Sequence, residues 1–277
     1  MKETKGVKAG NDIWNVLEFD SIKEFYDYIC STPLNNTFKW STLASNKANG
    51  YNNWFGTDTF EEATDLLKNG WNTGAKELTK KLKITETQKD VQMQFKSILG
   101  VCGYQAIVPL YLNGIPQNMV NRKQTPTKQK VITINKVTCV SCGVSSETLQ
   151  DESIKCFQII KKIEASGIRV NLNLMISTGH VCVKIRLKSA GEKLNISKLA
   201  FPLVHTAMFR RLYFRFIEVY PTIPESFRFG YGKVPTESQF KAVCGKNEIM
   251  LPTLLGYSMN GEKLKELSVD ELIAKFS

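Results

Sequence analysis

Apolar residues recur at helical spacing in the first part of the chain. Ile22, Phe25 and Ile29 share one face of a helix that Ser21 can cap. A second stripe of this kind, in residues 57–70, ends at an Asn-Gly pair, which is typical of a helix C-terminus. The pattern predicts a helical N-terminal part.

From residue 131 onward the spacing becomes that of an α/β protein. Residues 131–140, 168–176 and 181–187 alternate or are β-branched and predict strands. Residues 153–166 have apolar side chains at helical period and stop at a glycine. A strand, a helix and a strand in succession predict a βαβ unit with a right-handed crossover.

The longest apolar region, residues 196–220, predicts two helical pieces with Pro202 near an end of the first. Apolar residues at helical spacing should face the core. We expect the outer face of this region to carry Arg210, Arg211 and Arg215.

The remaining segments complete the expected organisation of one compact unit. Glycines and prolines among short apolar runs in residues 100–122 predict turns and loops. Residues 122–130 carry four positive charges and no negative one, which indicates an exposed connector. The expected parts are a helical N-terminal part (1–95), a loop-rich connector (96–130), an α/β core (131–235) and a C-terminal tail with a short helix (236–277).

Composition adds an expectation about compartment and partners. The 277 residues include 37 Lys and Arg against 26 Asp and Glu, a formal charge of +11 that favours polyanions. No run of 18 apolar residues and no leader pattern occurs, so we expect a soluble intracellular protein that does not enter a membrane. Seven cysteines, an odd number in apolar surroundings, predict reduced thiols.

Two groups of side chains are candidates for contacting nucleic acid. Cations of the connector and the long helical region could neutralise phosphates; they are Arg122, Lys123, Lys128, Lys130, Arg210, Arg211 and Arg215. Bases could stack on the aromatics of a glycine-rich run, Phe227, Phe229 and Tyr231. The alternatives are a solvated charged surface for the cations and a packed connector for the aromatics.

Candidate catalytic chemistry is sparse. Cys139 and Cys142 form the one Cys-x-x-Cys motif, and no second pair completes a zinc site. His205 stands among apolar residues, which indicates packing rather than a general base. Without a phosphate-binding loop, nucleophile elbow or metalloprotease motif, we expect no catalytic residue, no metal and no cofactor.

Three longer motifs resemble a family of uncharacterised bacteriophage and mobile-element proteins, a domain of unknown function. The motifs occupy residues 54–63 with Asn69-Gly70-Trp71, residues 108–119 and residues 199–211. The resemblance implies that the central portion is similar to a von Willebrand factor A-like α/β layer or a related layered sheet. Its metal-binding members place an Asp-x-Ser-x-Ser motif where this chain has residues 137–141 without a carboxylate, so no metal site is expected.

These observations lead to one functional hypothesis and two alternatives. The hypothesis is a phage-encoded, non-enzymatic binding or assembly protein that associates with nucleic acid or nucleoprotein. The alternatives are a module that binds a phage or host protein, as a virion or host-takeover factor, and a cryptic enzyme. The expected location is the cytoplasm of an infected host cell or the virion, and the sequence leaves the oligomeric state open.

Overall fold

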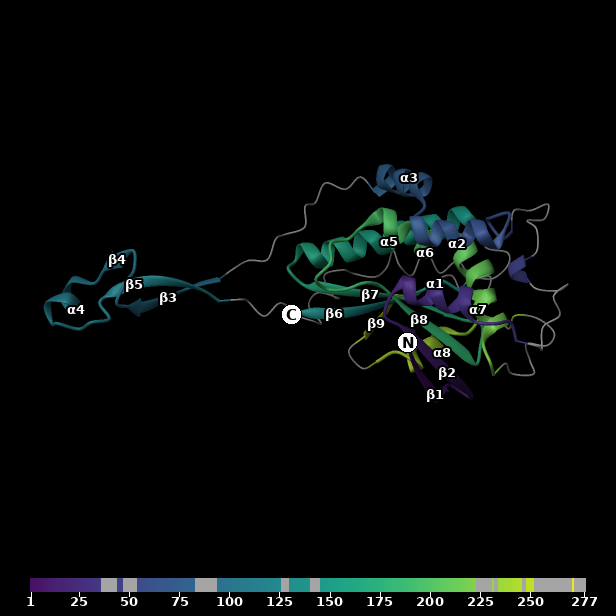
Figure 1. Ribbon diagram of the computed structural model, residues 1–277, viewed down its shortest axis with the longest axis horizontal. Helices are drawn as coiled ribbons and strands as arrows, with labels where there is room; N and C mark the ends of the chain where they lie inside the picture. Colours follow the sequence, from purple (N-terminus) through teal and green to yellow (C-terminus); the bar gives the residue numbers. More distant parts are fainter. Residues whose placement is uncertain are drawn as a thin grey trace.

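The computed structural model contains a six-stranded mixed sheet with helices on both sides and a separate three-stranded sheet (Figure 1). This is a mixed α/β architecture, as the sequence pattern predicts. No helix among the described residues is long and apolar enough to cross a bilayer. The structure describes residues 1–35, 44–46, 54–82, 94–125, 130–139, 145–222, 231, 234–245, 248–251 and 271.

The large sheet has the strand order β1-β2-β8-β7-β6-β9. Its strands are β1 (Lys2–Ala9), β2 (Asp12–Phe19), β6 (Val131–Val137), β7 (Arg169–Ser177), β8 (Val181–Lys188) and β9 (Glu248–Leu251). The pairs β2–β8, β6–β7 and β6–β9 are parallel, and the pairs β1–β2 and β7–β8 are antiparallel.

The chain begins with strands, so the expected helical N-terminal part is wrong at its start. Strands β1 and β2 form a hairpin whose second strand pairs with β8. Trp14 and Val16 are buried on one face of β2, and Leu17 and Phe19 are buried on the other. Burial on both faces removes the alternation by which a half-exposed strand is recognised.

Two helices, α1 (Ile22–Ser31) and α2 (Phe60–Asn69), follow the hairpin where periodicity and capping residues predict them. Ser21 accepts a hydrogen bond from the backbone of Glu24 at the start of the first helix, and Thr59 accepts one from Glu62 at the start of the second. The other helices of this part are the short η2 (Ala44–Asn46) and α3 (Asn72–Leu82).

The predicted strand, helix and strand are β6, α5 (Ser146–Ala165) and β7. Two buried ion pairs fix α5 to the sheet. Lys136 Nζ lies 2.5 Å from Glu152 Oε1, and Lys188 Nζ lies 2.6 Å from Glu164 Oε1. Breaking such a pair leaves an uncompensated buried charge, so each pair specifies how α5 sits on the sheet.

The long apolar region is helical in pieces, as predicted. It contains α6 (Ile196–Val204), the π-helix η3 (Met208–Tyr213) and α7 (Phe214–Val219), and α8 (Glu237–Ala242) follows later in the chain. Pro202 lies inside α6 near its C-terminus. A π-helix inserts residues relative to an α-helix and so changes which side chains face inward.

Residues 94–125 form a unit of their own, which we call the arm. It contains β3 (Gln94–Gly100), β4 (Gln105–Ala106), α4 (Val108–Leu112) and β5 (Met119–Thr125), with the strand order β3-β5-β4. The sequence indicates loops here, but three of these segments are strands in antiparallel pairs and the fourth is a short helix. Gly103 permits the backbone to pack closely against β5, because a Cβ at this position would lie 2.2 Å from the Val120 carbonyl oxygen. No arm residue whose side chain is described is buried.

Candidate functional site

Three of the predicted cations lie on exposed positions around the arm. Arg122 and Lys123 are exposed on β5, and Lys130 is exposed immediately before β6. Lys128 lies outside the described residues, as do Phe227 and Phe229.

The three helical arginines are not on an outer face, and that expectation is wrong. Arg210 is 4 % exposed and Arg211 is 0 % exposed. Arg211 donates from Nε to Thr57 Oγ1 at 2.9 Å, and its two Nη atoms donate to backbone oxygens of residues 45, 57 and 58. Arg215 stacks on the Phe60 ring at 5.2 Å, with Nη1 3.8 Å from a Glu218 carboxylate oxygen. Their guanidinium groups therefore connect the helical region 208–219 to residues 45–60.

These contacts join two of the three sequence motifs in space. Residues 54–58 of the first motif wrap the arginines of the third, with Arg210 4.7 Å above the Trp54 ring and donating to the Trp54 carbonyl oxygen. Gly56 has φ +80°, and a Cβ there would lie 2.2 Å from Thr206 Oγ1. The tryptophan, the glycine and the arginines therefore form one tightly packed contact between residues 54–58 and residues 206–211.

Tyr231 is packed against the interior of the protein. Its ring stacks on Phe214 at 4.3 Å, and its hydroxyl donates to the buried Glu218 carboxylate at 2.5 Å. This is the packed-connector alternative at the one residue of the glycine-rich aromatic run, 227–232, that the structure describes.

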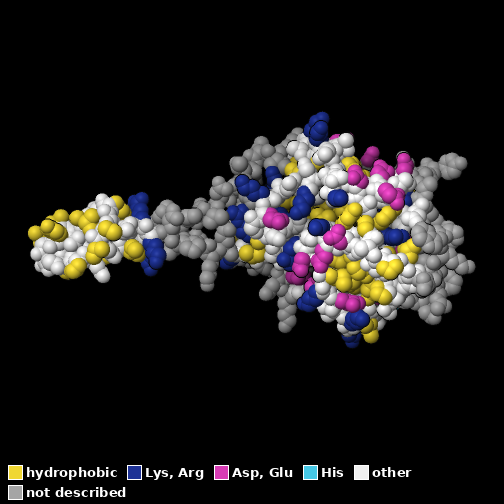
Figure 2. Space-filling model, viewed as in Figure 1, with side chains coloured by type: hydrophobic (Ala, Val, Ile, Leu, Met, Phe, Trp, Pro, Cys, Tyr) yellow, Lys and Arg dark blue, Asp and Glu magenta, His cyan; other side chains and the backbone are white. Residues whose placement is uncertain are grey.

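Cations are concentrated at the base of the arm (Figure 2). Lys96 and Lys123 are directly opposite each other on β3 and β5, and Ser97 is opposite Arg122. The Arg122 guanidinium lies 5.0 Å from the Tyr104 ring centroid. No Asp or Glu occurs anywhere between residues 91 and 146. We call Lys96, Arg122 and Lys123 the cationic collar.

A further basic position adjoins Lys130 at the edge where β6 and β7 begin. The Arg169 backbone N–H donates to the Lys130 carbonyl oxygen at 2.8 Å, so the two residues are neighbours. Sequence reasoning missed Lys96 and Arg169 as partners of the connector cations. Only strand pairing brings them beside Lys123 and Lys130, and one sequence does not reveal that pairing.

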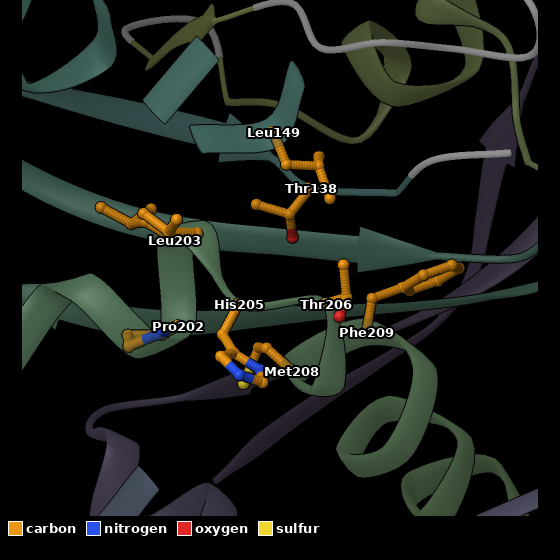
Figure 3. Close-up of a pocket in the computed structure, with 9 residues that line it drawn as sticks. Thr138, Leu149, Pro202, Leu203, His205, Thr206, Met208 and Phe209 are labelled. Carbon is orange, nitrogen blue, oxygen red and sulfur yellow. The ribbon is translucent and has the colours of Figure 1, made fainter. Parts of the chain in front are cut away.

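A small pocket lies at the C-terminal end of β6, between α5 and α6 (Figure 3). Thr138, Leu149, His205 and Thr206 contribute to its lining. Thr138 Oγ1 is buried and has no hydrogen-bond partner within the described part of the chain. His205 is partly buried, stacked on Phe201 at 5.0 Å and edge-on to Trp71 at 4.8 Å. Burial lowers the pKa of His205 to about 4, so the ring is neutral near pH 7.

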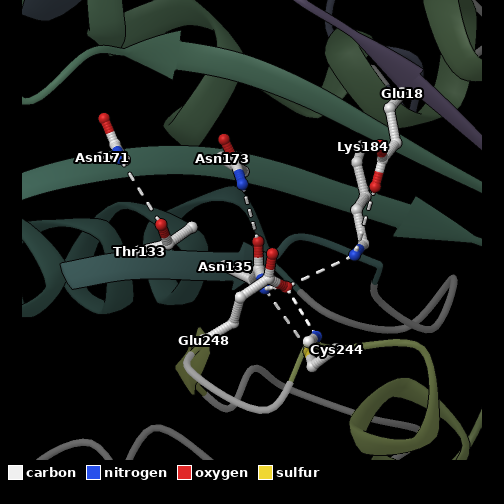
Figure 4. Close-up of polar contacts among 9 residues, drawn as sticks. Glu18, Thr133, Asn135, Asn171, Asn173, Lys184, Cys244 and Glu248 are labelled. Atoms are coloured by element: carbon white, nitrogen blue, oxygen red, sulfur yellow. Dashed lines mark hydrogen bonds and ion pairs between the residues drawn. The ribbon is translucent and has the colours of Figure 1, made fainter. Parts of the chain in front are cut away.

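A polar network crosses the other face of the sheet (Figure 4). Glu248 Oε2 accepts hydrogen bonds from Asn135 Nδ2 at 2.6 Å and from the Gly245 backbone N–H at 2.9 Å. Lys184 Nζ lies 3.4 Å from the same oxygen and 3.7 Å from Glu18. Burial opposes ionisation, but these donors and the Lys184 charge lower the pKa of Glu248 overall. The network holds β9 against the sheet.

The cysteines and acidic residues offer little chemistry in the described regions. Cys139 is buried, which raises its pKa to about 12 and makes it a poor nucleophile, while Cys142 lies outside the described residues. Six cysteines are described, and all six are free thiols. Among described residues, no group of three or more His, Cys, Asp or Glu is arranged to hold a metal ion.

Comparison with known proteins gives a family and no relative of known activity. No curated protein and no solved structure matches the chain. Residues 10–272, nearly the whole chain, match the family model described as a domain of unknown function, DUF7192. The chain therefore belongs to the DUF7192 family.

Proposed function

We propose that this is a non-enzymatic binding protein that associates with nucleic acid through the cations at the base of its arm. The observation that carries the proposal is the Lys96–Lys123 pair, two like charges directly opposite each other in a stretch of 56 residues without an acidic side chain. Like charges at directly opposed sheet positions destabilise the sheet. A bound polyanion relieves that repulsion.

The surrounding cations fit an extended phosphate backbone better than a single small anion. Arg122 and Lys123 are successive residues of β5, so their side chains point to opposite faces of the arm sheet. Lys130 and the neighbouring Arg169 continue the positive charge to the edge of the large sheet. Such an arrangement supports contacts to phosphates rather than to particular bases.

An enzymatic role has weaker support from the groups that could perform it. His205 is neutral and packed between two aromatic rings, and burial suppresses ionisation of Cys139. The Glu248 carboxylate accepts hydrogen bonds from Asn135 and from the Gly245 backbone, which hold β9 against the sheet. These contacts use the candidate groups for packing.

The test is equilibrium binding of duplex DNA and single-stranded RNA at several salt concentrations. Changing Lys96, Arg122, Lys123 and Lys130 to Gln should reduce the logarithmic salt slope for duplex DNA by roughly 3 to 4, about 0.9 per lost phosphate contact. The matched control changes four exposed lysines of β1 and α1 to Gln, namely Lys2, Lys5, Lys8 and Lys23. The control removes equal charge and should leave the slope nearly unchanged.

Equal losses in both variants would show that only net charge matters and would contradict a defined interface. Absence of binding by the unmodified protein at low salt would favour the alternative, a protein–protein interaction module.

The proposed setting is a bacteriophage or mobile element, with the protein acting in the infected host cytoplasm or in the virion. Support comes from the resemblance of residues 54–63, 108–119 and 199–211 to proteins of such elements. The parallel β6–α5–β7 unit supports a von Willebrand factor A-like relationship for the central portion.

A further inference from the structure

The outer part of the arm exposes apolar side chains to an unusual degree. Eight of the eleven large hydrophobic residues exposed in the described regions lie between Ile98 and Ile115. The most exposed are Leu112 at 76 % and Val101 at 73 %, followed by Tyr111 and Val108. Contiguous exposed apolar surface of this kind marks an interaction site. We call Val101, Val108, Tyr111 and Leu112 the apolar tip.

Charge around the apolar tip has one sign only. Residues 97–121 contain no charged side chain, and the cationic collar bounds this stretch on both strands (Figure 2). A complementary surface would therefore combine accessible apolar groups with acidic side chains.

The body of the same protein carries such a surface on α1 and α2. These two helices contain five Asp and Glu but two Lys, although the whole chain has a charge of +11. Asp27, Glu61 and Asp65 are exposed, and Tyr26 and Phe60 between these helices are partly exposed. We call these five residues the acidic face, and Figure 2 shows acidic side chains gathered over α2.

Contacts between the helices support one continuous patch. Helices α1 and α2 pack together, and Lys68 of α2 places its Nζ 5.9 Å from the Tyr26 ring centroid. Neighbouring Cys30, burial, and the carboxylates of Asp27 and Asp65 raise the pKa of Tyr26. Tyr26 thus has acidic groups from both helices around it, with the Lys68 ammonium beside its ring.

We propose that the apolar tip and cationic collar of one copy dock on the acidic face of a second copy, head to tail. Apolar contact would supply affinity, and the opposed charges would fix orientation. The two surfaces differ, so each copy has one tip to insert and one acidic face to receive the tip of another copy. Association therefore continues into a ring or an open chain. The inference does not depend on nucleic-acid binding, because the variants below keep the whole collar.

The test uses two complementary full-length variants in sedimentation velocity. The tip variant is Val108→Asp with Leu112→Asp, and the face variant is Glu61→Lys with Asp65→Lys. All four changed side chains are exposed, so the fold should persist, which circular dichroism checks. Wild type should sediment as a species larger than one chain, and each variant alone should associate about tenfold or more weakly.

Mixing the variants gives the decisive result. The tip variant retains the acidic face and the face variant retains the tip, so the mixture should form a one-to-one dimer and nothing larger. A face variant that still associates alone would indicate contact between two arms and would overturn the proposal. So would a mixture without dimer, or a wild type that is monomeric throughout. Tip-dependent binding of monomeric wild type to phosphatidylserine vesicles would assign the tip to a membrane surface instead.

Discussion

At the scale of single residues, His205 shows how burial converts a potential catalytic group into a packing group. Its Nδ1 accepts a hydrogen bond from the Ala207 backbone N–H at 3.2 Å, and aromatic rings cover the imidazole. Protonation would end that hydrogen bond and place a charge in the interior. The folded protein therefore resists protonation until the pH falls to about 4.

This predicts a loss of stability in mildly acidic solution. Between the ordinary histidine pKa of 6.5 and about 4, the unfolded chain binds a proton that the folded chain does not, so the free energy of unfolding falls as the pH falls. The loss should approach about 3 kcal/mol at the lower limit. Urea unfolding across this range should show that His205→Asn removes much of this pH dependence.

The matched control is His180→Asn, at the only other histidine of the chain. His180 has φ 59°, a conformation that Asn tolerates well. The assignment of this pH dependence to His205 would be contradicted if the free energy of unfolding of His205→Asn depended on pH as in the wild type. Equal changes in the pH dependence of both variants would also contradict it.

At the scale of elements, η3 is joined to residues 54–58 through the side chain of Arg211. Arg211 is enclosed, and its fork donates to backbone oxygens of Ser45, Thr57 and Asp58. Several segments therefore depend on one guanidinium group for their polar contacts.

Arg211→Met should reduce the free energy of unfolding by about 3 to 5 kcal/mol, because several buried carbonyl oxygens would lose their donor. Chemical denaturation measures the loss. Arg186→Met, at an exposed position of β8, is the matched control and should change stability by about 0.5 kcal/mol or less. Comparable losses at both positions would show that Arg211 is not a special contact.

Apolar periodicity and helix-capping residues predict the helices and strands whose formation depends on residues close together in the sequence. Ser21 and Thr59 cap helices as their positions indicate, and the β6–α5–β7 unit follows from periodicity. Arg211 could not be placed in this way, because its partners lie about 150 residues away and a π-helix changes its direction. The arm strands contain charged and polar residues, so they lack the alternation of a half-buried strand.

At the scale of the whole molecule, the arm is separate from the buried core. None of the arm residues whose side chains are described, 96–123, belongs to the apolar cluster that fills the body. Gln94 and Thr125 are paired neighbours in the arm sheet, so a short linker can replace the residues between them. Removal of the arm should therefore leave the stability of the body nearly unchanged.

The most direct measurement of the central claim compares duplex-DNA binding by the full chain and by a chain with residues 95–124 replaced by Gly-Gly. We predict that the shortened chain has an unfolding midpoint close to that of the full chain. Its DNA affinity should be much lower, with a shallower dependence on salt. A shortened chain that folds and binds DNA with the affinity and salt slope of the full chain would contradict the claim that the arm carries the interface.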